Sequence, residues 1–230
     1  MKKLFREVIF EIEIKTILIA ALFLVSVFVF GYLAHEVVGE NESGFDNRVF
    51  HFFAQFNSPE FINVNRIFTF FGASYFSVPA YLILLIILFI SGRKTDGINI
   101  AIVAITSTAL MFGLKEYFHR KRPDLPVIRS LHNYSFPSGH ALSSFIFCSV
   151  LIYLIWKGGM RNIWKWILSV LLILFSVCIG ISRIVLRYHY PTDVIAGFCL
   201  ALAWVILSLW LERRLTPRRV ALQLDSKPVS

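Results

Sequence analysis

Six apolar runs, each about as long as a membrane is thick, constrain this chain more than any other feature. A membrane-spanning helix needs ~20 mostly apolar residues, whereas a helix on the surface of a soluble domain keeps one polar face. The runs cover residues 16–38, 73–91, 98–118, 136–156, 164–184 and 191–211. We therefore expect an all-α membrane protein, built as a bundle of six transmembrane helices.

The composition supports this fold class. Hydrophobic residues make up 57% of the chain and charged residues only 16%, whereas soluble domains carry about 25% charged residues. A formal net charge of +9 would indicate nucleic-acid binding in a soluble protein. Here it is explained by topology, because the cytoplasmic loops of membrane proteins collect lysine and arginine. We expect membrane lipids as partners, no nucleic acid and no obligate protein partner.

The distribution of basic residues predicts the orientation of the bundle. With a cytoplasmic N-terminus, the inner segments hold fourteen of the 23 lysines and arginines, and every short inner connection is basic. Both termini are then cytoplasmic. The first apolar run exceeds the ~7–15 residues of a cleaved signal core, so we interpret it as the first helix of a single integral membrane domain, residues 1–215.

Two segments fall outside the spans. The tail, residues 216–230, is polar and aperiodic, and we expect it to be disordered in the cytoplasm. The outer connecting segment, residues 40–72, begins polar and becomes rich in phenylalanine. Residues 45–56 can form a helix with one apolar side in the membrane interface. Such a helix is either a lid that guides lipid to a site or a connection packed on the rim of the bundle.

Three polar motifs interrupt the apolar chain. The first is Lys115 followed by Arg122-Pro123, the second is Pro137-Ser138-Gly139-His140, and the third is Ser182-Arg183 followed by His189 and Asp193. All three fall at the outer face under the predicted topology, because an even number of membrane crossings separates each motif from the next. Ionisable groups beside hydrocarbon are energetically costly, which favours a functional explanation.

Each motif taken alone has a plain structural explanation. Lys115 can extend its ammonium to the interface from the last turn of a helix. Pro137, Ser138 and Gly139 resemble an ordinary helix start. Asp193 in the first turn of a helix favours the helix dipole, with His189 as an interfacial residue. The co-occurrence of all three motifs favours a shared site.

The combined inventory fits phosphoryl transfer. Cations and a helix N-terminus can hold phosphate oxygens. Asp193, four residues after His189, can orient its imidazole. Cations outnumber carboxylates in this set, so a divalent ion would be repelled and we expect no metal and no other cofactor.

These eleven motif residues resemble the type 2 phosphatidic acid phosphatase (PAP2) superfamily, strongly over residues 98–212 and only in hydropathy before residue 98. The resemblance implies catalytic roles for His189 as nucleophile, His140 as general acid and base, and Asp193 as orienting carboxylate. It also implies phosphate binding by Lys115, Arg122, Ser138, Gly139 and Arg183.

The resemblance further implies a metal-independent lipid phosphatase that works through a phosphohistidine. Its substrate would be a lipid phosphomonoester or diphosphate, such as phosphatidate, phosphatidylglycerophosphate, lipid A or undecaprenyl diphosphate. The expected location is the bacterial inner (plasma) membrane, as a multi-pass protein whose site faces the periplasm or exterior. The alternatives are a lipid or ion transporter, or a catalytically silent membrane scaffold.

The remaining polar residues receive structural roles. Arg120 and Lys121 are interpreted as a patch for anionic lipids, Arg187 as a rim residue, and His119 has no assigned role. The other histidines, His35, His51 and His132, are expected to be structural or exposed. The three cysteines lie in apolar runs without metal-like spacing and are interpreted as small core residues.

Overall fold

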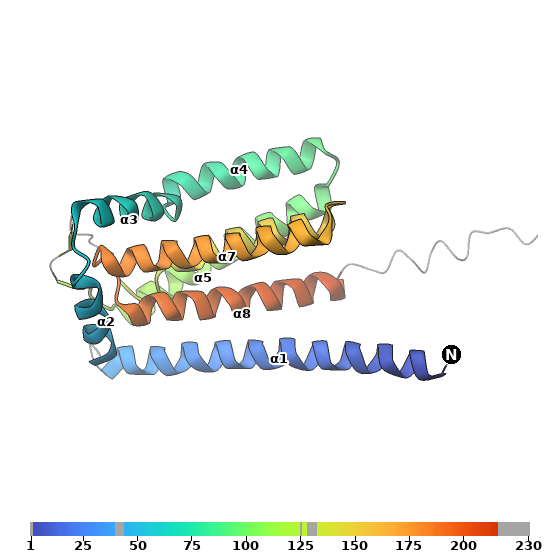
Figure 1. Cartoon of the computed structure of the whole chain (residues 1–230), viewed down its shortest axis with the longest axis horizontal. Coiled ribbons are helices and arrows are strands. Elements are labelled where there is room, and N and C mark those ends of the chain that lie inside the picture. The colour runs from blue at the N-terminus through green and yellow to red at the C-terminus, as the bar shows by residue number, and fades with distance from the viewer. Residues whose placement is uncertain (1, 40–43, 125, 128–132, 216–230) are drawn as a thin grey trace, which may run out of the picture.

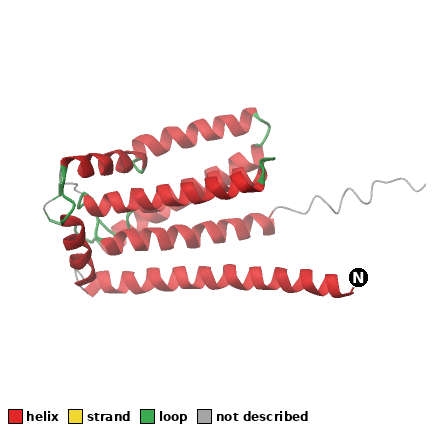
Figure 2. Ribbon diagram, viewed as in Figure 1, coloured by secondary structure: helices red, strands yellow, loops and turns green. Residues whose placement is uncertain are grey.

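The computed structural model describes residues 2–39, 44–124, 126–127 and 133–215, and these residues form α-helices and loops without a β-strand (Figure 1, Figure 2). The predicted tail and His132 lie outside the described residues. The helices are α1 (Lys2–Gly39), α2 (Gly44–Ala54), α3 (Pro59–Phe71), α4 (Ser74–Ile90), α5 (Lys94–Phe118), α6 (Gly139–Lys157), α7 (Asn162–Val185) and α8 (Pro191–Leu215).

The long helices match the six predicted spans. Five are individually long and apolar enough to cross a membrane, namely α5 to α8 and residues Ile14–Val38 of α1. The sixth is the pair α3 and α4, which passes the same test together with a bend of 43° between them. The predicted fold class, an all-α membrane bundle, is confirmed, and the protein is a multi-pass membrane protein.

The second predicted span, residues 73–91, corresponds to α4, and a further helix precedes it. Residues 59–71, expected within the outer connecting segment, form α3 and lead directly into α4. Ser58 caps α3 by accepting a hydrogen bond from the backbone N–H of Phe61 at 3.2 Å, and Pro59 suits the first turn. The helix axis breaks at Gly72 and Ala73, whereas Pro79 lies inside α4.

The helix ends separate into two groups (Figure 1). The α5–α6 and α7–α8 connections lie at one end, where α2 crosses the direction of the long helices. The turns between α4 and α5 and between α6 and α7 lie at the other end, together with the start of α1 and the end of α8. All three polar motifs therefore belong to the end covered by α2.

The core of the bundle lies along α6, which packs against both α7 and α8, while α1 packs against α8. At the motif end, Phe136 is fully buried against Leu33, Val37 and Ala196. Helix α2 packs against α7 and α8 at this end of the bundle. It turns Phe50 inward against Tyr190, whereas Phe45, Phe52 and Phe56 remain exposed.

Candidate active site

Four helix ends carry the candidate residues to one place. Helix α5 ends with Lys115 in its last turn, α6 begins at Gly139, α7 ends with Arg183 in its last turn, and α8 begins at Pro191. His119 closes α5 in a left-handed conformation with φ of 50°, which turns the chain away from the helix axis. This turn lets Arg120 and Arg122 run back over the bundle.

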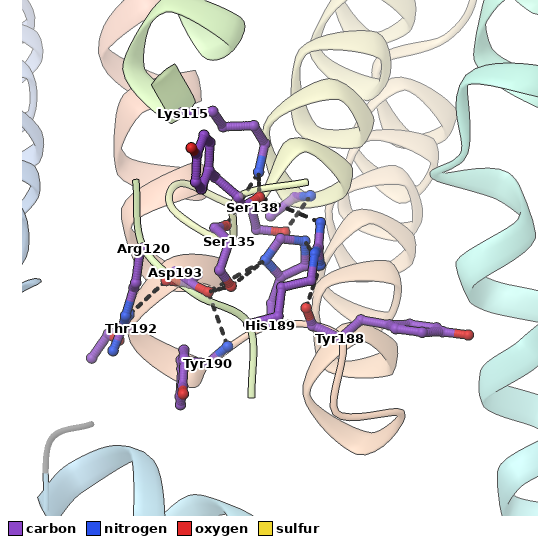
Figure 3. A network of polar contacts seen from close by, with 12 residues as sticks. Lys115, Arg120, Ser135, Ser138, Tyr188, His189, Tyr190, Thr192 and Asp193 are labelled. Atoms are coloured by element: carbon purple, nitrogen blue, oxygen red, sulfur yellow. Dashed lines mark hydrogen bonds and ion pairs between the residues drawn. The ribbon is translucent and has the colours of Figure 1, made fainter. Parts of the chain in front are cut away.

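Lys115 is buried and holds the loop before α6. Its Nζ donates hydrogen bonds to the carbonyl oxygens of Tyr134, at 2.6 Å, and Ser135, at 3.3 Å (Figure 3). The side chain is only 5% exposed, so it does not extend to the interface as the structural explanation required. Lys115 brings a positive charge into the site.

Arg122 joins two loops and the candidate nucleophile. Its guanidinium donates to the carbonyl oxygen and the side-chain oxygen of Asn133, both at 2.8 Å, and to the carbonyl of Tyr188. One terminal nitrogen lies 3.2 Å from Nε2 of His189. Burial lowers the pKa of Arg122 to about 10, so the guanidinium remains charged at neutral pH.

The hydrogen bonds around His189 select one tautomer. Arginine only donates, so Nε2 of His189 accepts from Arg122 and carries the lone pair. The Nδ1–H then faces Oδ2 of Asp193 and the hydroxyl of Ser135, each at 3.3 Å. An imidazole held in this way directs its Nε2 lone pair toward the Arg122 guanidinium.

Asp193 serves both as a helix cap and as the partner of His189. Its Oδ2 accepts the backbone N–H of Tyr190 at 3.0 Å and the hydroxyl hydrogen of Ser135. Asp193 is the third residue of α8, and its carboxylate caps the helix by accepting the N–H of Tyr190, the residue just before the helix. The two explanations considered for Asp193, helix cap and orienting carboxylate, are therefore met by the same geometry.

The start of α6 packs closely against α5 at Gly139, so a larger residue there would require Met111 to move. A β-carbon added there would lie 2.9 Å from Sδ of Met111. Ser138 is fully buried and caps α6, since its hydroxyl accepts from the N–H of Ala141 at 3.5 Å. The N–H of Ser138 donates to the backbone carbonyl of Asp193 at 3.0 Å, which fixes the start of α6 against α8.

Arg183 is buried beside the same site. Its guanidinium donates to the hydroxyl of Thr69 and lies 4.3 Å from the centre of the Tyr188 ring. Among the described atoms, its Nε has no hydrogen-bond partner. A buried guanidinium with a donor to spare suits an anionic ligand.

The electrostatics at His189 follow from this arrangement. Burial, together with the positive charges of Arg122, Lys115 and Arg183, holds the pKa of His189 well below its ordinary value of 6.5. The imidazole is thus neutral at physiological pH, which is the form that can act as a nucleophile. Among the described residues no group of three or more histidines, cysteines or acidic residues is placed to hold a metal ion.

Three residues of the cluster were not identified from the sequence. Arg120, interpreted as part of a lipid patch, is instead 3% exposed and paired with Asp193 and Asp46, while its neighbour Lys121 is exposed. Asp46 reaches this cluster from α2, and Ser135 from the loop before α6. Arg120 was overlooked because it stands in a run of basic residues, where one buried arginine cannot be told from its exposed neighbours by sequence.

The other polar residues largely match expectation. Arg187, the predicted rim residue, is half-buried with its guanidinium 5.0 Å from the centre of the Phe50 ring. His35 and His51 are exposed. The cysteines are free, with Cys148 buried and the other two half-buried.

Sequence comparison finds relatives of known type. The family model of the PAP2 superfamily matches residues 96–217. Phosphatidylglycerophosphatase B of Bacillus subtilis is 33% identical over 132 residues, which cover 57% of this chain and 65% of that protein. Undecaprenyl-diphosphatase of Sulfolobus acidocaldarius is 28% identical over 186 residues, covering 76% of this chain and 82% of that protein.

Solved structures share the fold. A transmembrane PAP2 type phosphatidylglycerolphosphate phosphatase from Bacillus subtilis superposes with a TM-score of 0.74 at 25% identity, over 87% of this chain and 98% of the other. LpxE of Aquifex aeolicus gives a TM-score of 0.60 at 27% identity, over 74% of this chain and 98% of the other.

Proposed function

The chain belongs to the PAP2 superfamily, and from that premise we propose that it is a membrane-embedded phosphatase that hydrolyses a phosphomonoester or diphosphate on a lipid. The observation that carries this proposal is the position of His189 between Asp193 and Arg122. One neighbour orients the imidazole, and the other supplies a cation where phosphate oxygens would bind.

The proposed reaction has two steps. In the first, Nε2 of His189 bonds to phosphorus, the bond from phosphorus to the lipid oxygen breaks, and protonated His140 gives its proton to that oxygen. In the second, His140 takes a proton from water, the water oxygen bonds to phosphorus, and the phosphorus–nitrogen bond breaks to release inorganic phosphate. His189 and His140 return to their starting forms.

The cations supply the charge stabilisation that phosphoryl transfer requires. Lys115, Arg122 and Arg183 surround the imidazole closely enough to lower its pKa. Ser138 and Gly139, at the start of α6, place a helix N-terminus beside them. Bound phosphate would be held by these five residues without a metal ion.

The site faces the periplasm or exterior of a bacterial plasma membrane, with both termini cytoplasmic. The support for this topology is the basic character of the opposite end of the bundle, where Arg93, Lys157, Arg161 and Arg213 lie. The relatives named above supply the substrate classes to be tested, namely phosphatidylglycerophosphate and undecaprenyl diphosphate, to which phosphatidate and lipid A are added.

The test is phosphate release by purified protein from these four lipids. We expect turnover of at least one, and a loss of about 10³-fold or more in His189→Ala, as for other covalent catalysts that lose their nucleophile. The matched control is His35→Ala, an exposed histidine on α1, which should keep the unaltered rate. A radiolabelled phosphoenzyme that is lost in acid and in His189→Ala would identify the intermediate.

Two outcomes would contradict the proposal. A protein that moves lipid across the bilayer of reconstituted vesicles without releasing phosphate would be a transporter. A protein that does neither, although correctly folded, would be a silent scaffold.

A further inference from the structure

Arg120 lies on the side of Asp193 away from His189 (Figure 3). Together with Asp46 and Asp193 it forms a buried trio of charged side chains. Arg120 lies between two carboxylates, with one terminal nitrogen 2.6 Å from Oδ1 of Asp193 and the other 3.1 Å from Oδ2 of Asp46. Asp46 and Asp193 are fully buried and Arg120 is 3% exposed. Neither Arg120 nor Asp46 is a residue to which the proposed reaction gives a role.

Asp46 also fixes the start of α8. Its Oδ1 accepts the backbone N–H of Thr192 at 2.9 Å, and its Oδ2 accepts the Thr192 hydroxyl at 2.9 Å. The Thr192 hydroxyl oxygen in turn accepts from Arg120 at 2.8 Å. The side chains of Asp46, Thr192 and Arg120 therefore form one hydrogen-bonded unit with the first turn of α8, next to Asp193.

The ring of Tyr190 closes this unit. The guanidinium carbon of Arg120 lies 4.0 Å from the centre of that ring, and the ring contacts Phe50 of α2. Stacking and two ion pairs restrain the orientation of the guanidinium, with one terminal nitrogen toward Asp193 and the other toward Asp46. A flexible lysine would not fix the carboxylate in this way.

The balance of charge is the second property of the trio. One guanidinium faces two carboxylates, which gives a net formal charge of −1. Without Asp46, the whole charge of Arg120 would be balanced by Asp193. The negative charge of Asp193, which stabilises an imidazolium at His189, would then be largely cancelled. In a buried site such a change acts strongly, because solvent does not screen it.

We propose that Arg120 and Asp46 are positioning residues of this active site: Arg120 fixes the Asp193 carboxylate against His189, and Asp46 preserves the negative charge of that carboxylate by balancing Arg120. Neither residue is proposed to touch substrate. The inference rests on the proposed function, in which His189 is the nucleophile and Asp193 orients it.

Other charged groups face His189 and set the background for the test. Lys115 comes from α5, Arg122 from the loop after it, and Arg183 from α7. His140 of α6 also interacts electrostatically with His189. These groups are unchanged in the variants below, so a shift in the titration of His189 reports the trio alone.

The experiment compares Asp46→Asn, Arg120→Gln and the double variant, using the full chain and whichever lipid of the panel the unaltered protein cleaves fastest. Each single substitution should lower kcat by about 10- to 100-fold, a cost like that of losing a group that orients a metal-binding histidine. KM should change much less. The double variant restores the net charge of −1 and should lose less kcat than the product of the two single losses.

The pH profile separates charge balance from a merely structural role. Removing the Asp46 charge disfavours the imidazolium, so the acidic limb of kcat/KM should move to lower pH. Removing the Arg120 charge should move it to higher pH, and the double variant should return it toward the unaltered position. A structural contact would lower thermal stability in both single variants without opposite shifts.

Two further variants keep the test decisive. Arg120→Lys preserves the positive charge and removes the planar guanidinium. We therefore expect kcat to fall while the acidic limb of the kcat/KM profile keeps its pH. Asp96→Asn removes a carboxylate paired with Arg93 and Lys157 at the opposite end of the bundle and should leave the limb unmoved. If Arg120→Gln cannot be purified folded, Asp46→Asn and Arg120→Lys decide the matter.

Three results would overturn the inference. The first is a limb that stays in place in Asp46→Asn, and the second is a limb that moves the same way in both single variants. The third is an unaltered kcat in Asp46→Asn. Each is distinguishable from failure of the proposed function, in which the unaltered protein would itself release no phosphate.

Discussion

Gly72, at the break between α3 and α4, lies directly against the imidazole of His140. A β-carbon added to Gly72 would lie 2.8 Å from Cδ2 of His140 and 2.6 Å from a methyl carbon of Ile179. The carbonyl oxygen of Gly72 is also 3.5 Å from the hydroxyl of Ser143, one turn along α6. The backbone at this break is therefore one wall of the space that His140 occupies.

Gly72→Ala should displace His140 and slow the reaction. Ile179 cannot yield easily because it is buried in α7, so the imidazole of His140 is the group that must move. A displacement of about 1 Å at a catalytic group costs about 100-fold in rate, so we expect a fall of that order in kcat with the fold retained. Steady-state phosphate release measures this.

The matched control for this substitution is Gly113→Ala in α5. A β-carbon at Gly113 would meet no atom within 4 Å, and alanine favours a helix more than glycine does. The control should keep full activity and gain slightly in thermal stability. Equal activities of the two variants would mean that Gly72 does not position His140.

The rate should remain high below the pH at which an ordinary histidine becomes protonated. Burial and the nearby cations hold the pKa of His189 well below 6.5. As the pH falls through that lowered pKa, the imidazole gains a proton and the nucleophile is lost, so kcat/KM should fall only in the more acidic range. Arg122→Gln removes one of the cations and should move this acidic limb to higher pH, although its overall rate will be lower.

A profile whose acidic limb lies above pH 6.5 in the unaltered protein would contradict the assignment of that limb to His189. The measurement is kcat/KM, since it reports the free enzyme.

Activity should survive removal of metal ions. The site gathers three cations around His189, and these leave no electrostatic advantage for a divalent ion. Phosphate release should therefore be the same with and without EDTA. Orthovanadate should inhibit, because five-coordinate vanadium resembles the transition state of phosphoryl transfer. Loss of activity in EDTA that Mg²⁺ restores would count against this site chemistry.

The two ends of the bundle should be reachable from opposite sides of the membrane. Asp124, in the loop after α5, and Asn162, at the start of α7, are both exposed. In intact cells whose outer membrane is permeabilised, a membrane-impermeant thiol reagent should label Asp124→Cys. It should label Asn162→Cys only after lysis. The native cysteines lie inside α6, α7 and α8 and should give little background; the reverse pattern would place the site at the cytoplasmic face.

The sequence predicted the spans because hydrocarbon leaves few alternatives for an apolar run. It did not predict α3 as a helix, because Asn65 and Arg66 lower the hydropathy of residues 59–71. The structure buries Asn65, whose side-chain amide donates to the carbonyl of Phe61 at 2.9 Å. That compensation depends on helix geometry and is invisible to a hydropathy scan.

The motif residues of the site were predictable because each stands at the end of an apolar run. His189 and Asp193 are four positions apart on either side of the start of α8, so the local turn of the chain brings them close together. Arg120 and Asp46 were not predictable in the same way, since their contact joins distant parts of the chain. The one signal that the sequence offered for Asp46 was its position as the one acid among residues 45–56.

The position of Asp46 has a consequence for how such proteins are compared and recombined. The stretch that matches the PAP2 family begins at residue 96, whereas the counter-charge to Arg120 comes from α2. A chimera that exchanges only the matching stretch between two members would join the arginine of one protein to the outer helix of another. Substitutions at positions 46 and 120 should therefore be inherited as a pair, and the smallest exchangeable unit extends back to include α2.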